Sequence, residues 1–211
     1  MKKLILLLFV FVLCETTTHA QNTISEIFTT TDIVFYGIDF SHVKLIGSTG
    51  FTDVPKIKDI YFESINNLMV NEKEKFCIGK FIRKKSVEYD LTVVKAQNQL
   101  SDVNNLVSDN PDDRLTLNEN IVQQIVSGYK VGDRTGIGIV FIMESLDKAG
   151  EKANMFVTFF DIATNKVLIT ERITSKPGGI GFRNYWANSI LNAMEKTGKR
   201  YGAWKKENMP K

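Results

Sequence analysis

Residues 137–143 read Ile-Gly-Ile-Val-Phe-Ile-Met, a run without a charged or polar side chain. Gly136 precedes this run and Glu144 follows it. An apolar run of this length between turn and charged residues is typical of a strand that is buried on both faces. We therefore place this segment at the centre of a β-sheet.

Two more strands and a helix are expected after the central run. Residues 155–162 and 167–173 are rich in β-branched and aromatic side chains, and a short turn separates them. Because the connection is so short, these strands must form an antiparallel hairpin. After a glycine-rich link, the sequence predicts a last helix over about residues 183–200, with Trp186 and Ile190 on its apolar face.

Strand and helix signals alternate before the central run. Residues 33–38 predict a strand, and a second short strand is expected after Phe40. Asp53 and Pro55 mark the start of a helix, and an apolar stripe with a period of about 3.6 residues continues from there to about Asn71.

The remaining segments complete the expected fold. Residues 87–94 predict a strand, and residues 97–114 predict a polar loop with short helix. Thr116 and Glu119 match a capping box at the start of another helix. This order of elements predicts an α/β or α+β fold with a single domain over residues 21–211. We expect a mixed sheet of about five strands, covered by three or more helices and followed by the C-terminal helix.

The first twenty residues have the layout of a secretory signal peptide. Lys2 and Lys3 precede an apolar run over residues 4–13, and Ala20 stands directly before Gln21. The apolar run is shorter than the roughly 20 residues that span a bilayer. We therefore expect cleavage after Ala20 and export to the periplasm or the outer membrane.

Cys14 offers a second interpretation of the leader. A lipoprotein signal also ends its apolar run at a cysteine, which then becomes acylated. A lipobox needs a small residue before that cysteine, and Leu13 is large. Cleavage after Ala20 is therefore preferred, and lipidation at Cys14 is the alternative.

The net charge and the apolar runs of the chain limit the kinds of partner that we expect. Loss of the leader removes two lysines and one glutamate, so the net charge falls from +3 to +2. A charge this close to zero argues against a nucleic-acid partner, because dedicated nucleic-acid domains are strongly basic. No second apolar run approaches membrane-spanning length, so we expect no transmembrane helix in the mature chain.

Few residues are suited to nucleophilic or metal chemistry. His42 and Cys77 are the single histidine and cysteine after the leader. A Cys–His dyad would need both of them, a serine triad lacks its G-x-S-x-G elbow, and zinc needs three or four N/S ligands. Asp109, Asp112 and Asp113 do not have the spacing of an EF-hand. We therefore predict no catalytic residue, no metal and no cofactor.

Two groups of residues are candidate binding sites. The free amides at a helix start favour a phosphate or a carboxylate. The first group precedes the last helix and consists of Lys176, Gly178, Gly179, Gly181 and Arg183. Clustered positive charges favour an anionic surface such as lipid headgroups or polysaccharide. The second group is the basic patch Lys80, Arg83, Lys84 and Lys85. A flexible hinge and a solvated face are the respective structural alternatives.

Residues 137–200 resemble a family of envelope modules. The hairpin from Phe160 to Leu168 has a strand that ends in Asp161 and turns through Thr-x-x-Val into its partner, and an amphipathic helix follows. This pattern is similar to the TolB amino-terminal and curli-assembly modules, and the leader resembles those of small secreted Bacteroidota proteins. The family's opening Pro-Phe pair is absent, and Asp39-Phe40 stands in a comparable place. The resemblance implies an α/β module that acts through protein contacts without catalysis.

Three functions are compatible with the sequence. The first is an exported, non-catalytic protein that contacts other envelope proteins. The second is a periplasmic or surface protein that binds a small ligand or a glycan near the sheet edge. The third is a carboxylate-based hydrolase that uses Glu144 and Asp161, which lie at or near strand ends.

Overall fold

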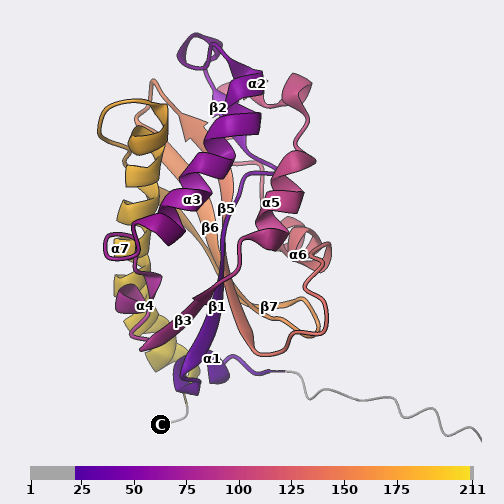
Figure 1. The fold of residues 1–211 in the computed structure, drawn as a ribbon, viewed down its shortest axis with the longest axis vertical. Helices are drawn as coiled ribbons and strands as arrows, with labels where there is room; N and C mark the ends of the chain where they lie inside the picture. Colours follow the sequence, from indigo (N-terminus) through magenta and orange to yellow (C-terminus); the bar gives the residue numbers. More distant parts are fainter. Residues whose placement is uncertain (1–21, 210–211) are drawn as a thin grey trace, which may run out of the picture.

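The computed structural model describes residues 22–209, so the predictions for the leader at Ala20 and Cys14 lie outside the described residues. The described chain forms one mixed sheet with helices on both sides, which confirms the predicted single-domain α/β fold (Figure 1). Among residues 22–209, no helix has both the length and the apolar character to cross a membrane.

The elements follow one another in an alternating order. The strands are β1 (Asp32–Asp39), β2 (Lys44–Ile46), β3 (Ser86–Tyr89), β4 (Val107–Ser108), β5 (Ile137–Asp147), β6 (Lys152–Asp161) and β7 (Lys166–Ser175). The α-helices are α1 (Glu26–Thr29), α2 (Val54–Lys56), α3 (Phe62–Asn71), α4 (Ile78–Phe81), α5 (Thr92–Gln99), α6 (Glu119–Ser127) and α7 (Phe182–Asn208). The 3-10 turns are η1 (Ser48–Gly50), η3 (Val103–Asn105) and η4 (Pro111–Arg114), and η2 (Ile57–Tyr61) is a π-helical turn between α2 and α3.

β5 is the centre of the sheet, as its apolar run predicts. Every residue of this strand is buried. Its first half pairs in parallel with β1, and its last residues pair in parallel with β2. β3 extends the sheet beyond β1, and β4 extends it beyond β2. On the other side of β5, β6 and β7 form the predicted antiparallel hairpin.

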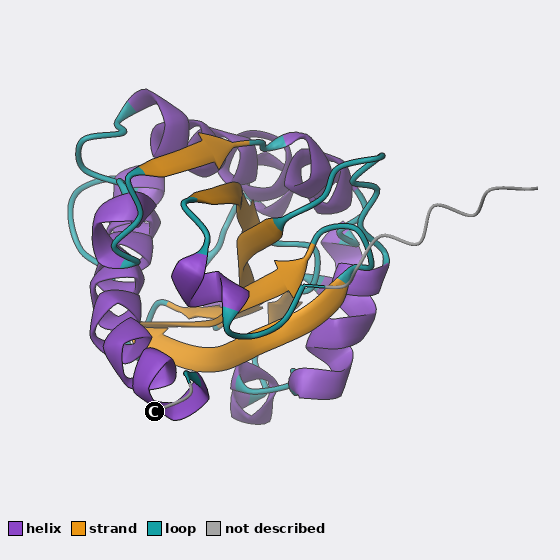
Figure 2. Cartoon of the chain, turned by 90° about the horizontal axis from the view of Figure 1, so that it is seen from below, coloured by secondary structure: helices purple, strands orange, loops and turns teal. Residues whose placement is uncertain are grey.

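Each face of the sheet has its own hydrophobic core. Figure 1 shows α3, α4 and α7 on one side and α5 and α6 on the other, and Figure 2 shows the strands enclosed between these helices. The larger core packs Phe35 and Phe141 against residues of α3 and α7. The smaller core packs Tyr36 and Phe160 against residues of α5 and α6. Burial of apolar area on both faces therefore holds the helices to the sheet.

Two buried asparagines complete the outer edge of β1. β3 accompanies β1 only as far as Phe35. Beyond that point, Asn66 of α3 accepts the Ile38 N–H at 2.8 Å and donates to the Ile38 carbonyl at 2.9 Å. Asn98 of α5 accepts the Phe40 N–H at 2.6 Å. The side-chain amides thus take the place of a neighbouring strand, which keeps buried backbone groups hydrogen-bonded.

The strand predicted over residues 87–94 is only half correct. β3 ends at Tyr89 and α5 begins at Thr92, so Val93 and Val94 pack as helix residues in the smaller core. The apolar side chains fit either structure over so short a segment, and tertiary packing decides between them.

The remaining differences concern element ends and short strands. Asn118 caps α6 in place of Thr116, and its side chain accepts the Ile121 N–H at 3.0 Å. Helix α7 extends beyond the predicted residues 183–200 in both directions. The sheet has seven strands in place of about five. β2 is the short strand expected after Phe40, whereas β4 has only two residues and lies in the segment predicted as a polar loop.

Candidate functional site

Four buried carboxylates lie in the described part of the chain, at Asp39, Glu144, Asp147 and Asp161. Asp39 ends β1 and accepts the Tyr129 hydroxyl at 2.7 Å and the Ser41 N–H at 2.7 Å. Burial, together with the charge of Asp39, raises the pKa of Tyr129 well above its ordinary value. The hydroxyl therefore stays protonated and serves as a fixed donor to Asp39.

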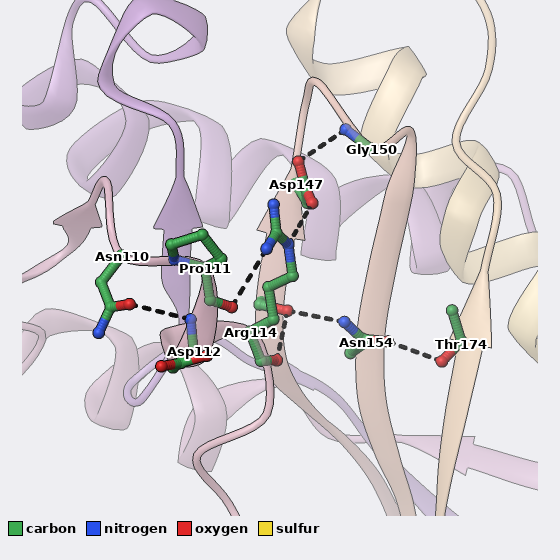
Figure 3. Close-up of polar contacts among 9 residues, drawn as sticks. Asn110, Pro111, Asp112, Arg114, Asp147, Gly150, Asn154 and Thr174 are labelled. Atoms are coloured by element: carbon green, nitrogen blue, oxygen red, sulfur yellow. Dashed lines mark hydrogen bonds and ion pairs between the residues drawn. The ribbon is translucent and has the colours of Figure 1, made fainter.

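Asp147 ends β5 and holds the η4 segment against the sheet (Figure 3). Its carboxylate accepts the Arg114 Nε–H at 2.6 Å and the Gly150 N–H at 2.7 Å. Burial disfavours the charge, but these two donors outweigh burial and lower the pKa of Asp147. The chain before α6 is therefore pinned to the end of the central strand.

A row of polar side chains crosses three strands beside Asp147. Thr174 of β7 donates to Asn154 Oδ1 at 2.6 Å, and Asn154 donates to Ser145 Oγ at 2.9 Å. Ser145 donates to the Arg114 carbonyl at 2.8 Å. Figure 3 shows how Thr174, Asn154 and Arg114 follow one another across the sheet. The row ties β7, β6 and β5 to the segment that leads into α6.

A second row includes Glu144, which is fully buried. Arg172 of β7 donates to both oxygens of Glu144, at 2.7 and 3.0 Å, and the Leu117 N–H donates to the same carboxylate at 2.7 Å. The Arg172 guanidinium also donates to the Leu117 carbonyl and lies 4.7 Å from the ring centroid of Phe156. A bidentate pair of this kind fixes geometry, so these contacts hold residue 117 close to β7.

Glu144 and Asp161 are too far apart to act as the two carboxylates of a hydrolase. Asp161 pairs with Ile137 at the other end of the β5–β6 ladder. The seven residues from Ile137 to Glu144 correspond to about 23 Å along the strand. A glycosidase needs its two carboxylates within roughly 10 Å. Asp161 instead accepts hydrogen bonds from Asn22 and Thr164, which outweigh burial and lower its pKa.

Both cations of the predicted anion site have a hydrogen-bonding or ionic partner of their own in the structure. Lys176 pairs with Glu151 at 3.1 Å, and the Arg183 guanidinium donates to a neighbouring asparagine. The Gly178 N–H donates to the Tyr185 carbonyl at 3.1 Å. Anion binding at this loop stays a prediction.

The predicted basic patch keeps only part of its charge at the surface. Lys84 is half-buried, its ammonium donates to a backbone carbonyl, and burial lowers its pKa. Lys80, Arg83 and Lys85 are exposed, and the Lys80 ammonium donates to the carbonyl of Glu74 at 3.2 Å. Contact with an anionic surface stays a prediction.

His42 and Cys77, the histidine and the cysteine within residues 22–209, have ordinary environments. His42 lies on an exposed turn after β1, with its Nδ1 2.8 Å from Ser41 Oγ. Cys77 is half-buried directly before α4. Within residues 22–209, no group of three or more histidine, cysteine, aspartate or glutamate side chains could hold a metal ion.

Two hollows lie along the free edge of β7. One has a volume of about 520 Å³ and is bounded by residues 117–120, Phe156 and part of β7. The other has a volume of about 500 Å³ and lies between the start of α6, β7 and the end of α7. Both share Glu119, Asn120, Thr170 and Glu171, so they form one continuous depression. We name it the β7 groove.

Helix α7 forms the second wall of the β7 groove. Arg200 donates to both oxygens of Glu171 at 2.7–2.9 Å, and Trp204 Nε1 donates to the same carboxylate at 2.8 Å. Among the described strands, β7 pairs only with β6. An edge strand therefore runs between two helices, α6 on one face of the sheet and α7 on the other.

Sequence reasoning did not find the β7 groove, although a signal for it exists. Glu171 and Arg172 interrupt a strand that is otherwise mostly apolar. Charged residues in the middle of a strand are typical of a sheet edge. The sequence gives no such signal for the two walls. Residues 117–120 and 200–208 are distant from β7 in the sequence, and only the tertiary structure places them beside it.

No family model, curated protein or solved structure matches this chain. The function is therefore inferred from the geometry of the described residues.

Proposed function

We propose that this chain is an exported, non-catalytic protein of the cell envelope that acts through contacts with other proteins. The β7 groove carries this proposal. Monomeric proteins usually blunt or cover a long sheet edge, because its backbone groups invite pairing. Here the two helices flank the edge of β7 and leave a groove along it, which is the shape of a binding surface.

Two features of the sequence support the same function. The leader over residues 1–20 has the layout of an export signal. The hairpin and the C-terminal helix resemble envelope modules that act through protein contacts. The buried carboxylates add support, because Glu144, Asp147 and Asp161 each bind donors that hold segments of the fold together.

Small-ligand binding is the second candidate function. A hollow of about 320 Å³ lies beside the turn that follows β1, and its lining includes Ser41, His42 and Asp102. Open α/β sheets bind ligands outside the carboxyl ends of parallel strands, which is where this turn lies. Lys44 also lines the hollow, but its ammonium is bound to Asn105 at 2.6 and 2.7 Å.

Site-specific photo-cross-linking in the native cells tests the proposed contact. A photoreactive amino acid replaces Asn120 on the α6 wall, and the matched control carries it at Leu100, an exposed position after α5. We expect a discrete cross-linked protein from position 120 and none from position 100. Equal products from both positions, or none from position 120, would contradict contact through the β7 groove.

Mass spectrometry of the mature amino terminus tests export in the same cells. A chain that begins at Gln21 supports cleavage after Ala20. An acylated Cys14 would replace that cleavage with a lipid anchor, and an intact Met1 would contradict export through this leader.

A further inference from the structure

We propose that the β7 groove binds an extended, basic peptide segment of a partner protein, which joins the sheet as a strand beside β7. This inference rests on the proposed function and specifies the chemistry of the partner. It follows from the direction of the backbone groups along β7 and from the charges on the two walls.

Gln123 of α6 shows which backbone groups point away from the sheet at the start of β7. Its side-chain carbonyl accepts the Val167 N–H at 2.9 Å, and its side-chain amide donates to the Asn165 carbonyl at 2.9 Å. A helix side chain can reach these groups only if they point away from β6. Gln123 therefore takes the place of a peptide group in a neighbouring strand.

A bulge then changes which residues of β7 direct their backbone N–H and C=O groups away from β6. Phe160 pairs with Val167, whereas Phe159 pairs with Ile169, so Leu168 is an extra residue on β7. Backbone groups alternate between the two edges of a strand. Because Val167 points outward and one residue is inserted, Ile169 points toward β6.

The outward positions beyond the bulge are therefore Thr170, Arg172 and Thr174. Two contacts agree with this outward direction of the backbone groups. The side-chain oxygens of Thr170 and Thr158 lie 2.8 Å apart, which fits the close spacing of a non-hydrogen-bonded pair. Lys196 of α7 donates to the Thr174 carbonyl at 2.6 Å, as it can when that carbonyl faces outward.

The middle of the edge remains open. Gln123 covers its beginning, and Lys196 covers its end. Between them, Thr170 and Arg172 each present one N–H and one C=O to the groove, and no side chain of residues 22–209 is bonded to these four groups. They have the two-residue spacing of a ladder, so an added strand of about five residues can bond to all four.

The walls select a slender partner. A second copy would bring its own α6 and α7 to the junction, so two pairs of helices would crowd the place where the strands must approach to about 4.8 Å. An extended segment has no such walls. We therefore assign the groove to a peptide segment and not to a second β7.

The charges along the walls favour basic side chains on that segment. Arg172 and Arg200 are already paired with carboxylates of the sheet. Glu119 on the α6 wall and Glu207 on the α7 wall have no salt bridge within the described chain. Successive side chains of an extended segment point to opposite walls, so a lysine or arginine on either face meets a carboxylate.

Binding of a defined peptide to the full chain tests strand addition. The probe is acetyl-Thr-Val-Lys-Val-Lys-Val-Thr-amide, and the charge control has glutamate in place of lysine. We expect the basic probe to bind at least tenfold more tightly, and to slow hydrogen exchange at the amides of Thr170 and Arg172. Absence of binding by the basic probe, or binding without slower exchange at these two amides, would overturn the proposal.

Two changes to the backbone separate strand addition from other binding modes. Thr170→Pro removes an outward N–H and takes no bond from the β6–β7 ladder, whereas Thr170→Val keeps that N–H. We expect the proline variant to bind the probe at least tenfold more weakly and the valine variant to bind within twofold of the parent. A probe with N-methylated alternate amides gives the same test on the unaltered protein, and equal binding by this probe would overturn the proposal.

The outcomes for the two proposals are distinguishable. If position 120 gives its cross-linked protein and Thr170→Pro leaves that product unchanged, the contact function stands and strand addition is wrong. If position 120 gives no product while the probe binds as expected, the groove binds peptides but the proposed contact in the cells is wrong.

Discussion

Single residues explain how β1 continues past the end of β3. Gly37 has a φ of +90°, and a Cβ at this position would lie 2.5 Å from Asn66 Oδ1. Glycine permits this backbone and leaves room for the Asn66 amide, which binds both the N–H and the C=O of Ile38. A small residue on the strand and an amide on α3 therefore act together, although 29 positions separate them.

Asn66→Leu tests this arrangement at the residue scale. Leucine leaves the two backbone groups of Ile38 with one partner fewer in a buried site, and each such loss costs about 1–3 kcal/mol. We expect the free energy of unfolding in urea to fall by about 2–4 kcal/mol. Asn104→Leu is the matched control, because Asn104 is exposed, and its effect should stay within about 0.5 kcal/mol. A loss below 1 kcal/mol for Asn66→Leu would contradict the role of this amide.

Elements with strong local patterns were predictable, whereas elements fixed by distant contacts were not. The run in β5 and the hairpin of β6 and β7 follow from their composition and their short turn. The boundary between β3 and α5 does not, since Val93 and Val94 suit a strand as well as a helix. The cap of α6 lies two residues beyond the predicted Thr116, because Thr116 and Asn118 are both good capping residues and the Leu117 N–H is bound to Glu144 between them.

The contact of β7 with β5 through Arg172 is testable at the element scale. Arg172→Leu leaves the buried Glu144 carboxylate without its cation, so we expect the free energy of unfolding to fall by about 3–5 kcal/mol. The double variant Glu144→Leu, Arg172→Leu removes both charges and should be more stable than the single variant. Chemical denaturation of the four proteins in this cycle measures the coupling. Strictly additive losses would show that the pair does not act as a unit.

Over the whole molecule, two carboxylates fasten opposite ends of the β5–β6 ladder. Asp147 binds Arg114 of η4, and Asp161 binds Asn22 at the beginning of the described chain. The pKa of each carboxyl group is below its ordinary value of 3.8 in the folded protein. The unfolded chain therefore binds more protons than the folded protein as the pH falls toward that value.

This linkage predicts the acid dependence of stability. The contribution of the two carboxylates should be constant above about pH 5 and should be lost as the pH falls below about 4, through their folded-state pKa values. Denaturation midpoints of the parent and of the double variant Asp147→Asn, Asp161→Asn, followed from pH 7 to pH 3, should show a shallower decline for the variant. Asp133→Asn, at an exposed turn, is the control. Equal declines for the parent and the double variant would contradict the prediction.

The candidate sites predicted from sequence and the groove found in the structure do not share residues. The predicted groups are contiguous stretches, near Lys80 and near Lys176, because a single sequence shows only local clusters. The β7 groove collects residues 117–120, the strand β7 and the end of α7. The charged pair Glu171 and Arg172 is the one signal in the sequence that this strand lies at the edge of the sheet.

The sequence by itself determined the α/β class, the central position of β5, the late hairpin and the C-terminal helix, because apolar periodicity and short turns act over a few residues. Tertiary structure alone decided that the edge of β7 is open between Gln123 and Lys196, and that Thr170 and Arg172 face outward there. The reason is physical: a one-residue bulge reverses which backbone groups face outward, and the side chains that cover or expose them come from helices distant in the chain.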